Sequence, residues 1–147
     1  MIRKMNKEDL NQVADLEPSC FSLPWTLSQW QREFENPFGQ GVVLEEETIR
    51  GYAWFWVLDR DIQLVRIGIH PSVRHNGWGS LLLAEGMEIG RQAGCESMSL
   101  DVSVHNQPAR NLYEKNGFVY SHTSRRYYSD GSDAIVYLKS FKRGDEQ

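Results

Sequence analysis

A strand–turn–helix pattern at residues 62–89 constrains the fold of this chain more than any other feature. Residues 64–69 are rich in β-branched side chains and end before Pro71, which is typical of a β-strand. Residues 74–79 follow as an R-x-x-G-x-G turn. Beyond the turn, small or apolar residues recur at the spacing of one helical face, namely Leu82, Gly86, Ile89 and Ala93. The sequence therefore predicts a strand that leads through a glycine-rich turn directly into a helix.

The glycine-rich turn has the composition of an anion-binding loop. Gly77 and Gly79 would let backbone N–H groups approach a ligand without an intervening Cβ. The start of the helix adds unpaired N–H donors and the positive end of the helix dipole, a combination that suits a pyrophosphate. The same glycines also suit a plain tight turn, and the dinucleotide fingerprint G-x-G-x-x-G is absent from this stretch. The turn alone therefore leaves both interpretations open.

A second motif covers residues 106–118 and reads N-x-x-A-x-x-L-Y-x-x-x-G-F. Asn106 is predicted to cap a helix whose inner face carries Ala109, Leu112 and Tyr113, and Gly117 suits the end of that helix. Such a helix alone would be ordinary core packing. Combined with the upstream R-x-x-G-x-G turn, it resembles motifs A and B of the Gcn5-related N-acetyltransferases (GNAT), whose cosubstrate is acetyl-coenzyme A (acetyl-CoA).

The resemblance implies the GNAT fold, an α/β (α+β) architecture with a mixed, mostly antiparallel sheet of about seven strands and about four flanking helices. In that fold the fourth and fifth strands are parallel and splayed around the cofactor. The length of the segment from residue 64 to 104 independently fits a β–α–β unit with parallel strands. A single domain is expected over residues 1–141, followed by a disordered polar tail at 142–147. We expect strands near residues 2–5, 41–45, 49–58, 64–69, 97–104, 119–128 and 134–141, and helices after Asn6 (broken at Pro18), at 27–34, after Gly79 and after Asn106.

The closer resemblance is to the bacterial ribosomal-protein-alanine N-acetyltransferases, the RimI type, and it extends over about residues 2–141. Its most discriminating feature lies in the last predicted hairpin, where Arg126-Tyr127-Tyr128 precedes Asp133-Ala134-Ile135. Three other segments carry it: Phe21 with Pro24-Trp25-Thr26, then Ile67-Gly68-Ile69-His70-Pro71, and Leu100-Asp101-Val102. The resemblance implies direct attack in a ternary complex by the N-terminal α-amine of a protein, such as a ribosomal protein that starts with Ala.

Two residues receive catalytic roles from the resemblance. Tyr113 stands where the family keeps the general acid that protonates the coenzyme A thiolate; without that role it would be a packed aromatic residue. Asp101 stands where the RimI type carries a Glu, and some related N-terminal acetyltransferases carry a His. A carboxylate shorter by roughly 1.5 Å favours proton transfer through a water over direct abstraction. A solvated strand residue is the alternative interpretation of Asp101.

Binding residues are assigned by the same resemblance. The acetyl-CoA pyrophosphate would meet Arg74, Gly77 and Gly79, and the pantetheine arm would meet the strand. Phe21, Trp25, Tyr127 and Tyr128 would line the acceptor site, although Phe21 and Trp25 could instead plug the edge of the core. The remaining cofactor residues implied are Ile67, Gly68, Ile69, His75, Asn76, Trp78, Ser80 and Asn106.

Amine chemistry favours an α-amine acceptor. Its reference pKa of about 7.7–8.0 leaves it partly neutral at neutral pH, whereas a lysine amine at about 10.4 is almost wholly charged. A weak, water-linked base can therefore serve the first and hardly the second. Two alternatives remain open: a small-molecule amine acceptor, such as a polyamine or an aminoglycoside-like compound, and a non-catalytic acyl-CoA sensor.

Composition excludes several other classes of protein. A net charge of −4 disfavours a nucleic-acid partner, and no segment is long and apolar enough to cross a membrane. Cys20 and Cys95, like the 4 histidines, show no metal-ligand spacing, so no metal is expected. The absence of a signal-peptide pattern and the reduced thiols indicate a cytoplasmic protein, which we expect to be a monomer or a weak dimer.

Overall fold

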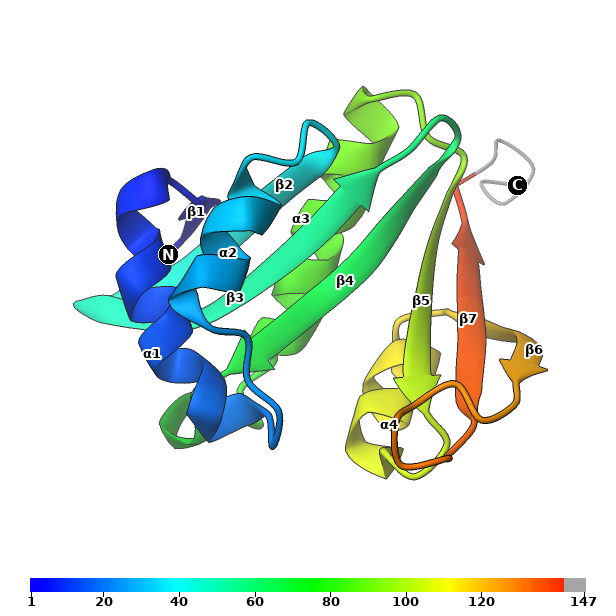
Figure 1. Ribbon diagram of the computed structural model, residues 1–147. Helices are drawn as coiled ribbons and strands as arrows, with labels where there is room; N and C mark the ends of the chain where they lie inside the picture. Colours follow the sequence, from blue (N-terminus) through cyan, green and yellow to red (C-terminus); the bar gives the residue numbers. More distant parts are fainter. Residues whose placement is uncertain (142–147) are drawn as a thin grey trace.

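The computed structural model describes residues 1–141, and the predicted tail at 142–147 lies outside the described residues. Its centre is a 7-stranded sheet with the strand order β1-β2-β3-β4-β5-β7-β6 (Figure 1). Only β4 and β5 are parallel, and the other neighbouring strands are antiparallel. The mixed sheet with parallel fourth and fifth strands confirms the predicted fold class. The strands are β1 (Ile2–Lys4), β2 (Gly39–Glu46), β3 (Thr48–Val57), β4 (Asp61–Ile69), β5 (Ser97–Ser103), β6 (Val119–Ser124) and β7 (Ala134–Ser140).

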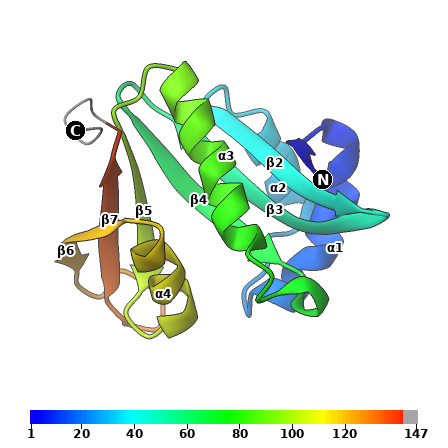
Figure 2. The ribbon, with the colours of Figure 1, turned by 180° about the vertical axis from the view of Figure 1, so that it is seen from behind.

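Within residues 1–141, four α-helices cover the sheet in two layers. The first two cover one face of the β1–β4 half, and the other two lie on the opposite face, where Figure 2, seen from behind, shows α3 in front of β2–β4 and α4 in front of β5 and β7. Two clusters of buried side chains match these layers, one on each face. The helices are α1 (Leu10–Cys20), α2 (Leu27–Phe34), α3 (Trp78–Gln92) and α4 (Gln107–Lys115), with short 3-10 turns η1 (Lys7–Asp9) and η2 (Pro71–Val73).

The strands β4 and β5 part halfway along their length. They pair only from Asp61 opposite Ser97 to Leu64 opposite Leu100. Beyond this point β4 bulges, because Leu64 and Arg66 pair with consecutive residues of β3 and leave Val65 as the extra residue. A bulge bends the strand that carries it. The ends of β4 and β5 therefore diverge (Figure 1), as the predicted splaying requires, and expose facing backbone edges.

Two local predictions were wrong. The helix expected to break at Pro18 continues through it to Cys20, because a proline in the last turn costs one helical hydrogen bond while Leu10, Val13 and Leu16 are buried in the core. The strand expected to reach Tyr128 ends at Ser124 instead. Arg126 adopts φ 51, a left-handed conformation that cannot continue a strand.

The helix caps predicted at Asn106 and Gly117 are confirmed, and Thr26 and Gly94 provide two more. Thr26 and Gln29 form a reciprocal capping box at the start of α2, with Gln29 N–H donating to Thr26 Oγ1 at 3.1 Å. Asn106 caps α4 by accepting the N–H of Ala109 at 3.3 Å. Gly94 and Gly117 follow the last residues of α3 and α4 with φ 86 and 88. These caps fix where α2 and α4 begin, and with them the residues that border the site.

Candidate active site

The glycine-rich turn opens the start of α3 to the outside. His75 and Gly77 both adopt left-handed backbone, with φ 67 and 82, and Gly77 precedes the helix without a side-chain cap. A Cβ built on Gly77 would have no neighbour within 4 Å, so this side of the loop is open. The bond from Leu81 N–H to Gly77 O (3.2 Å) begins the helical pattern. The N–H groups of residues 78–80 lie before it, where a helix start offers donors to an anion.

Gly79 has a different function in the same loop. A Cβ on Gly79 would lie 3.1 Å from Leu112 Cδ2 of α4 and 3.4 Å from Ile69 Cδ1 of β4. The missing side chain therefore lets the start of α3 approach both the diverging end of β4 and α4. This close approach sets the width of the space between them.

A first cavity of about 500 Å3 occupies that space. It lies between the end of β4, the glycine-rich turn and α4, and it gathers every residue predicted to contact the cofactor except Asn76, whose side-chain amide donates to Val73 O (3.2 Å). The sequence interpretation missed Lys115, which lines the cavity one helical turn after Leu112 and brings a positive charge to it. The predicted residues that line this cavity are Ile67, Gly68, Ile69, Arg74, His75, Gly77, Trp78, Gly79, Ser80 and Asn106.

Arg74 lines the first cavity and also forms hydrogen bonds that stabilise its wall. Its Nε donates to Ile69 O (2.8 Å) and its Nη2 to Ser19 O (3.2 Å). The side chain thus joins the glycine-rich turn to the end of β4 and to the end of α1. Next to it, the Cys20 thiol faces Ile69 O (3.6 Å), and burial raises its pKa. The pyrophosphate contact expected of Arg74 stays a prediction.

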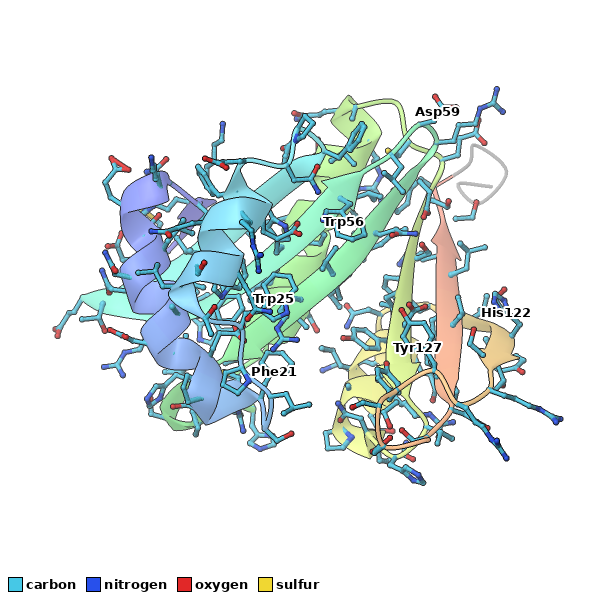
Figure 3. All side chains as sticks on the ribbon, viewed as in Figure 1. Phe21, Trp25, Trp56, Asp59, His122 and Tyr127 are labelled. Atoms are coloured by element: carbon cyan, nitrogen blue, oxygen red, sulfur yellow. The ribbon has the colours of Figure 1, made fainter. Side chains whose placement is uncertain are left out.

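A second cavity of about 570 Å3 opens on the other side of the parted strands. One wall is the loop of residues 21–25 between α1 and α2, and the opposite wall is the loop between β6 and β7. Figure 3 shows Phe21 and Trp25 on one side of the parting and Tyr127 on the other. Phe21, Ile67 and Asn106 line both cavities. The two spaces therefore meet at the point where β4 and β5 separate.

The four predicted acceptor residues divide into two kinds. Phe21 and Tyr128 line the second cavity. Trp25 and Tyr127 do not line it: Trp25 packs edge-on against Trp30 with ring centroids 4.8 Å apart, and the exposed Tyr127 packs edge-on against Tyr128 at 5.0 Å. Trp25 therefore fits the alternative interpretation, in which it packs at the edge of the core. Phe21 both packs on the core and lines the two cavities.

Tyr113 lies on α4 at the inner end of the second cavity. Its ring is buried between Phe118 and Tyr137, with centroid distances of 5.9 and 6.3 Å. Burial raises the pKa of Tyr113 well above its ordinary value, and the neighbouring Tyr128 phenol raises it further. The side chain is therefore a neutral phenol that can donate a hydrogen bond or a proton.

Asp101 is an exposed residue of β5 that lines the same cavity. Its negative charge is the main cause that raises the pKa of Tyr127, with which it also shares a hydrogen bond. Burial, followed by the charge of Asp101, raises the pKa of Tyr128 to about 12. Asp101 thus interacts with both phenols of the β6–β7 loop and lines the same cavity as Tyr113.

The sequence interpretation missed Arg66, which lines the second cavity and forms an ion pair with the fully buried Glu17 at 2.8 Å. Within residues 1–141, no group of three or more His, Cys, Asp or Glu side chains is placed to hold a metal ion. In the same range, no helix has the length and apolar character needed to span a membrane.

Comparisons with known proteins identify the family. Residues 10–118 match the model of the acetyltransferase (GNAT) family. The chain is 33% identical over 138 residues to a Bacillus subtilis (strain 168) protein that is named a candidate ribosomal protein bS18-alanine N-acetyltransferase, covering 92% of this chain and 91% of that one. It is 25% identical over 144 residues to the ribosomal protein bS18-alanine N-acetyltransferase of Haemophilus influenzae, covering 96% and 98%.

A solved structure shares the same fold. The ribosomal-protein-S18-alanine N-acetyltransferase from Escherichia coli superposes with a TM-score of 0.87 at 23% identity, over 97% of this chain and 94% of that one. The glycine-rich turn, the parted strands and the family match agree with one another, and this chain belongs to the GNAT family of N-acetyltransferases.

Proposed function

We propose that this N-acetyltransferase acetylates the N-terminal α-amine of a protein that begins with a small residue, alanine above all, and that a ribosomal protein is its acceptor. One observation carries the proposal: two cavities of similar size meet at Phe21, Ile67 and Asn106, and the second holds Tyr113 and Asp101. One cavity suits the cosubstrate and the other the amine. Such an arrangement supports direct transfer between two ligands bound at the same time.

The first cavity fits acetyl-CoA, the cosubstrate of this family. The open helix start at residues 78–80 and the positive charge of Lys115 suit its pyrophosphate. The unpaired edge of β4 beyond Leu64 offers backbone groups at Ile67 and Ile69 to an extended, amide-containing arm. When bound, the cosubstrate supplies the acetyl group as a thioester.

Charge in the second cavity suits an amine. The positive charge of Arg66 is paired with Glu17, so the carboxylates of Asp101 and Asp130 determine the local field. Asp130 is held ionised, because hydrogen bonds from Ser132 lower its pKa. A negatively charged cavity attracts an ammonium group and raises its local concentration.

Tyr113 and Asp101 divide the proton transfers. Asp101 accepts a proton from the acceptor ammonium through a water, since its side chain is one methylene shorter than a glutamate, and this frees the attacking lone pair. Tyr113 remains protonated because burial raises its pKa. The same shift makes the phenol a weaker acid, so its proton transfer to the departing sulfur depends on the close placement of the two groups. The attacking nitrogen loses its second proton as the C–S bond breaks, and this proton returns to the Tyr113 phenolate through water. Asp101 releases the first proton to solvent, so both residues regain their starting protonation state.

The choice of an α-amine over a lysine amine rests on three supports. An α-amine loses its proton more easily, by more than two pKa units in reference compounds of about 7.7–8.0 against about 10.4. The acceptor cavity is walled by two loops, which favours a chain end over a lysine that is flanked by backbone on both sides. The names of the relatives in Bacillus subtilis and Haemophilus influenzae also specify alanine acetylation of a ribosomal protein.

A thiol-release assay tests the proposal. Peptides that begin with Ala, Ser, Gly or Met and contain one internal lysine are compared with the same peptides blocked at the N-terminus, and with free polyamines. We expect turnover of the unblocked peptides, fastest with Ala, and mass spectrometry should place the acetyl group on the α-amine. Equal turnover of blocked peptides would assign the enzyme to lysine side chains, and turnover of polyamines alone would assign it to small amines.

A further inference from the structure

The acceptor loop, residues 21–25 between α1 and α2, is fastened to the body of the protein by one ion pair. The N–H of Trp25 donates to Glu17 Oε1 (2.8 Å). The carbonyl of Leu23 accepts from Arg66 Nη2 (3.0 Å). Arg66 Nη2 itself donates to Glu17 Oε1 at 2.8 Å. Two backbone hydrogen bonds therefore hold the loop, one made to Glu17 and the other to Arg66.

The ion pair is built into the core. Glu17 is fully buried and also accepts a hydrogen bond from the buried phenol of Tyr52. Tyr52 reaches it across Gly68 of β4, where an added Cβ would lie 2.5 Å from the phenol oxygen. A buried carboxylate without partners is costly, so Glu17 and Arg66 each fix the place of the other.

Both aromatic side chains of the acceptor loop also rest on the guanidinium of Arg66. The Arg66 Cζ lies 3.7 Å from the centroid of the Phe21 ring and 4.9 Å from that of Trp25. A planar guanidinium can stack on aromatic faces while it donates in its own plane, and a lysine ammonium cannot do both. The position of the Phe21 ring, and therefore of the wall shared by the two cavities, is set by Arg66.

We propose that Arg66 is a positioning residue that holds the acceptor loop in the conformation competent to bind the amine, and that Glu17 supports it, both by fixing Arg66 and by accepting the N–H of Trp25. This inference rests on the proposed function, because it takes the second cavity as the acceptor site. Loosening the loop lowers the population of the competent conformation, and the apparent affinity falls by the same fraction. Acceptor binding is therefore the step affected, while the thioester and Tyr113 stay in place.

Arg66→Lys keeps the positive charge and removes the planar guanidinium, whose donors lie in one plane. If the competent population falls to about one tenth, the KM for an Ala-starting peptide rises about 10-fold. We expect kcat to stay within about 2-fold of the original enzyme. The calorimetric affinity for acetyl-CoA should change less than KM does, because the acceptor loop contributes only Phe21 to the first cavity. Arg91→Lys is the matched control, because Arg91 stacks on Phe141 at 5.0 Å and pairs with Glu88 at 3.7 Å on a surface that lines neither cavity. It should change none of these values.

A second variant tests the same inference in case Arg66→Lys does not fold. Glu17→Gln combined with Arg66→Met leaves no unpaired buried charge and keeps an oxygen for Trp25 N–H. This double variant should fold and show the same rise in KM. An unchanged peptide KM in both folded variants overturns the inference, as does a fall in kcat without a change in KM.

Amide hydrogen exchange separates this inference from the proposed function, because it needs no activity. The N–H of Trp25 and its loop neighbours should exchange faster in Arg66→Lys than in the original protein or in Arg91→Lys. If the original protein acetylates no peptide, the proposed function fails, and the exchange result still decides whether Arg66 positions the loop. Unchanged exchange shows that it does not.

Discussion

Replacing Tyr113 by Phe removes one oxygen atom from the inner end of the acceptor cavity. The ring keeps its contacts with Phe118 and Tyr137, so the free energy of unfolding should change by no more than about 1 kcal/mol. If the hydroxyl donates the proton to the departing sulfur, kcat should fall roughly 10²-fold, the lower end of general-acid catalysis, or about 2.7 kcal/mol of activation free energy. The affinity for acetyl-CoA, measured by calorimetry, should not change.

The matched control is Tyr137→Phe. Tyr137 belongs to the same aromatic cluster, but its hydroxyl donates to Glu114 (2.5 Å) and lines neither cavity. That variant should lose about 1–3 kcal/mol of stability in urea unfolding and keep its turnover at saturating substrate. Near-normal turnover in Tyr113→Phe, or equal losses of turnover in both variants, would reduce Tyr113 to a packing residue.

The raised pKa of Tyr113 sets the pH range of this experiment. A phenol is an acid only while it is protonated, and its ordinary pKa is about 10. Burial raises the pKa of Tyr113, so the proton stays in place up to and beyond that value. The kcat of the original enzyme should therefore show no loss between about pH 8 and pH 10 that depends on Tyr113. A fall in this range that disappears in Tyr113→Phe would contradict the assignment.

Three further predictions follow from the site and its support. Gly77→Val forces a β-branched residue to φ 82 and should weaken acetyl-CoA binding by at least about 10-fold in calorimetry, whereas Gly94→Val, at φ 86 away from both cavities, should not. Asp101→Asn should reduce kcat/KM most at low pH, where the acceptor amine is charged, and progressively less towards about pH 9; a pH-independent loss would contradict the base assignment. Gly86→Ala places a Cβ 2.3 Å from the Phe55 ring, so urea unfolding should reveal a loss of about 1–3 kcal/mol with unchanged acetyl-CoA affinity.

Much of the fold was predictable because its signals are local. The cap at Thr26, the left-handed Gly94 and Gly117, and the alternation along β5 depend on residues within a few positions of one another. The glycine-rich turn belongs to this group, and its neighbours in sequence line one cavity. Such features are kept in the folded protein, because the local conformational preference of the chain and its tertiary packing agree.

The supporting structure of the site was not predictable in the same way. Glu17 and Arg66 are 49 positions apart, and a charged residue on a predicted helix is normally assigned to solvent. The sequence predicts that Trp25 and Tyr127 line the acceptor site. Whether a ring lines a cavity or packs against another ring depends on contacts between distant segments. Pro18 does not end α1 for a related reason, since burial of the helix around it outweighs one lost hydrogen bond.

Phe21 is in contact with both cavities, and this has a thermodynamic consequence. If the first ligand moves or orders this ring, the affinity for the second changes by some factor. Linkage requires the second ligand to change the affinity for the first by the same factor. With such coupling, an acceptor KM measured at subsaturating acetyl-CoA would report both affinities together, and the conformational free energy of the acceptor loop would influence the order of substrate addition.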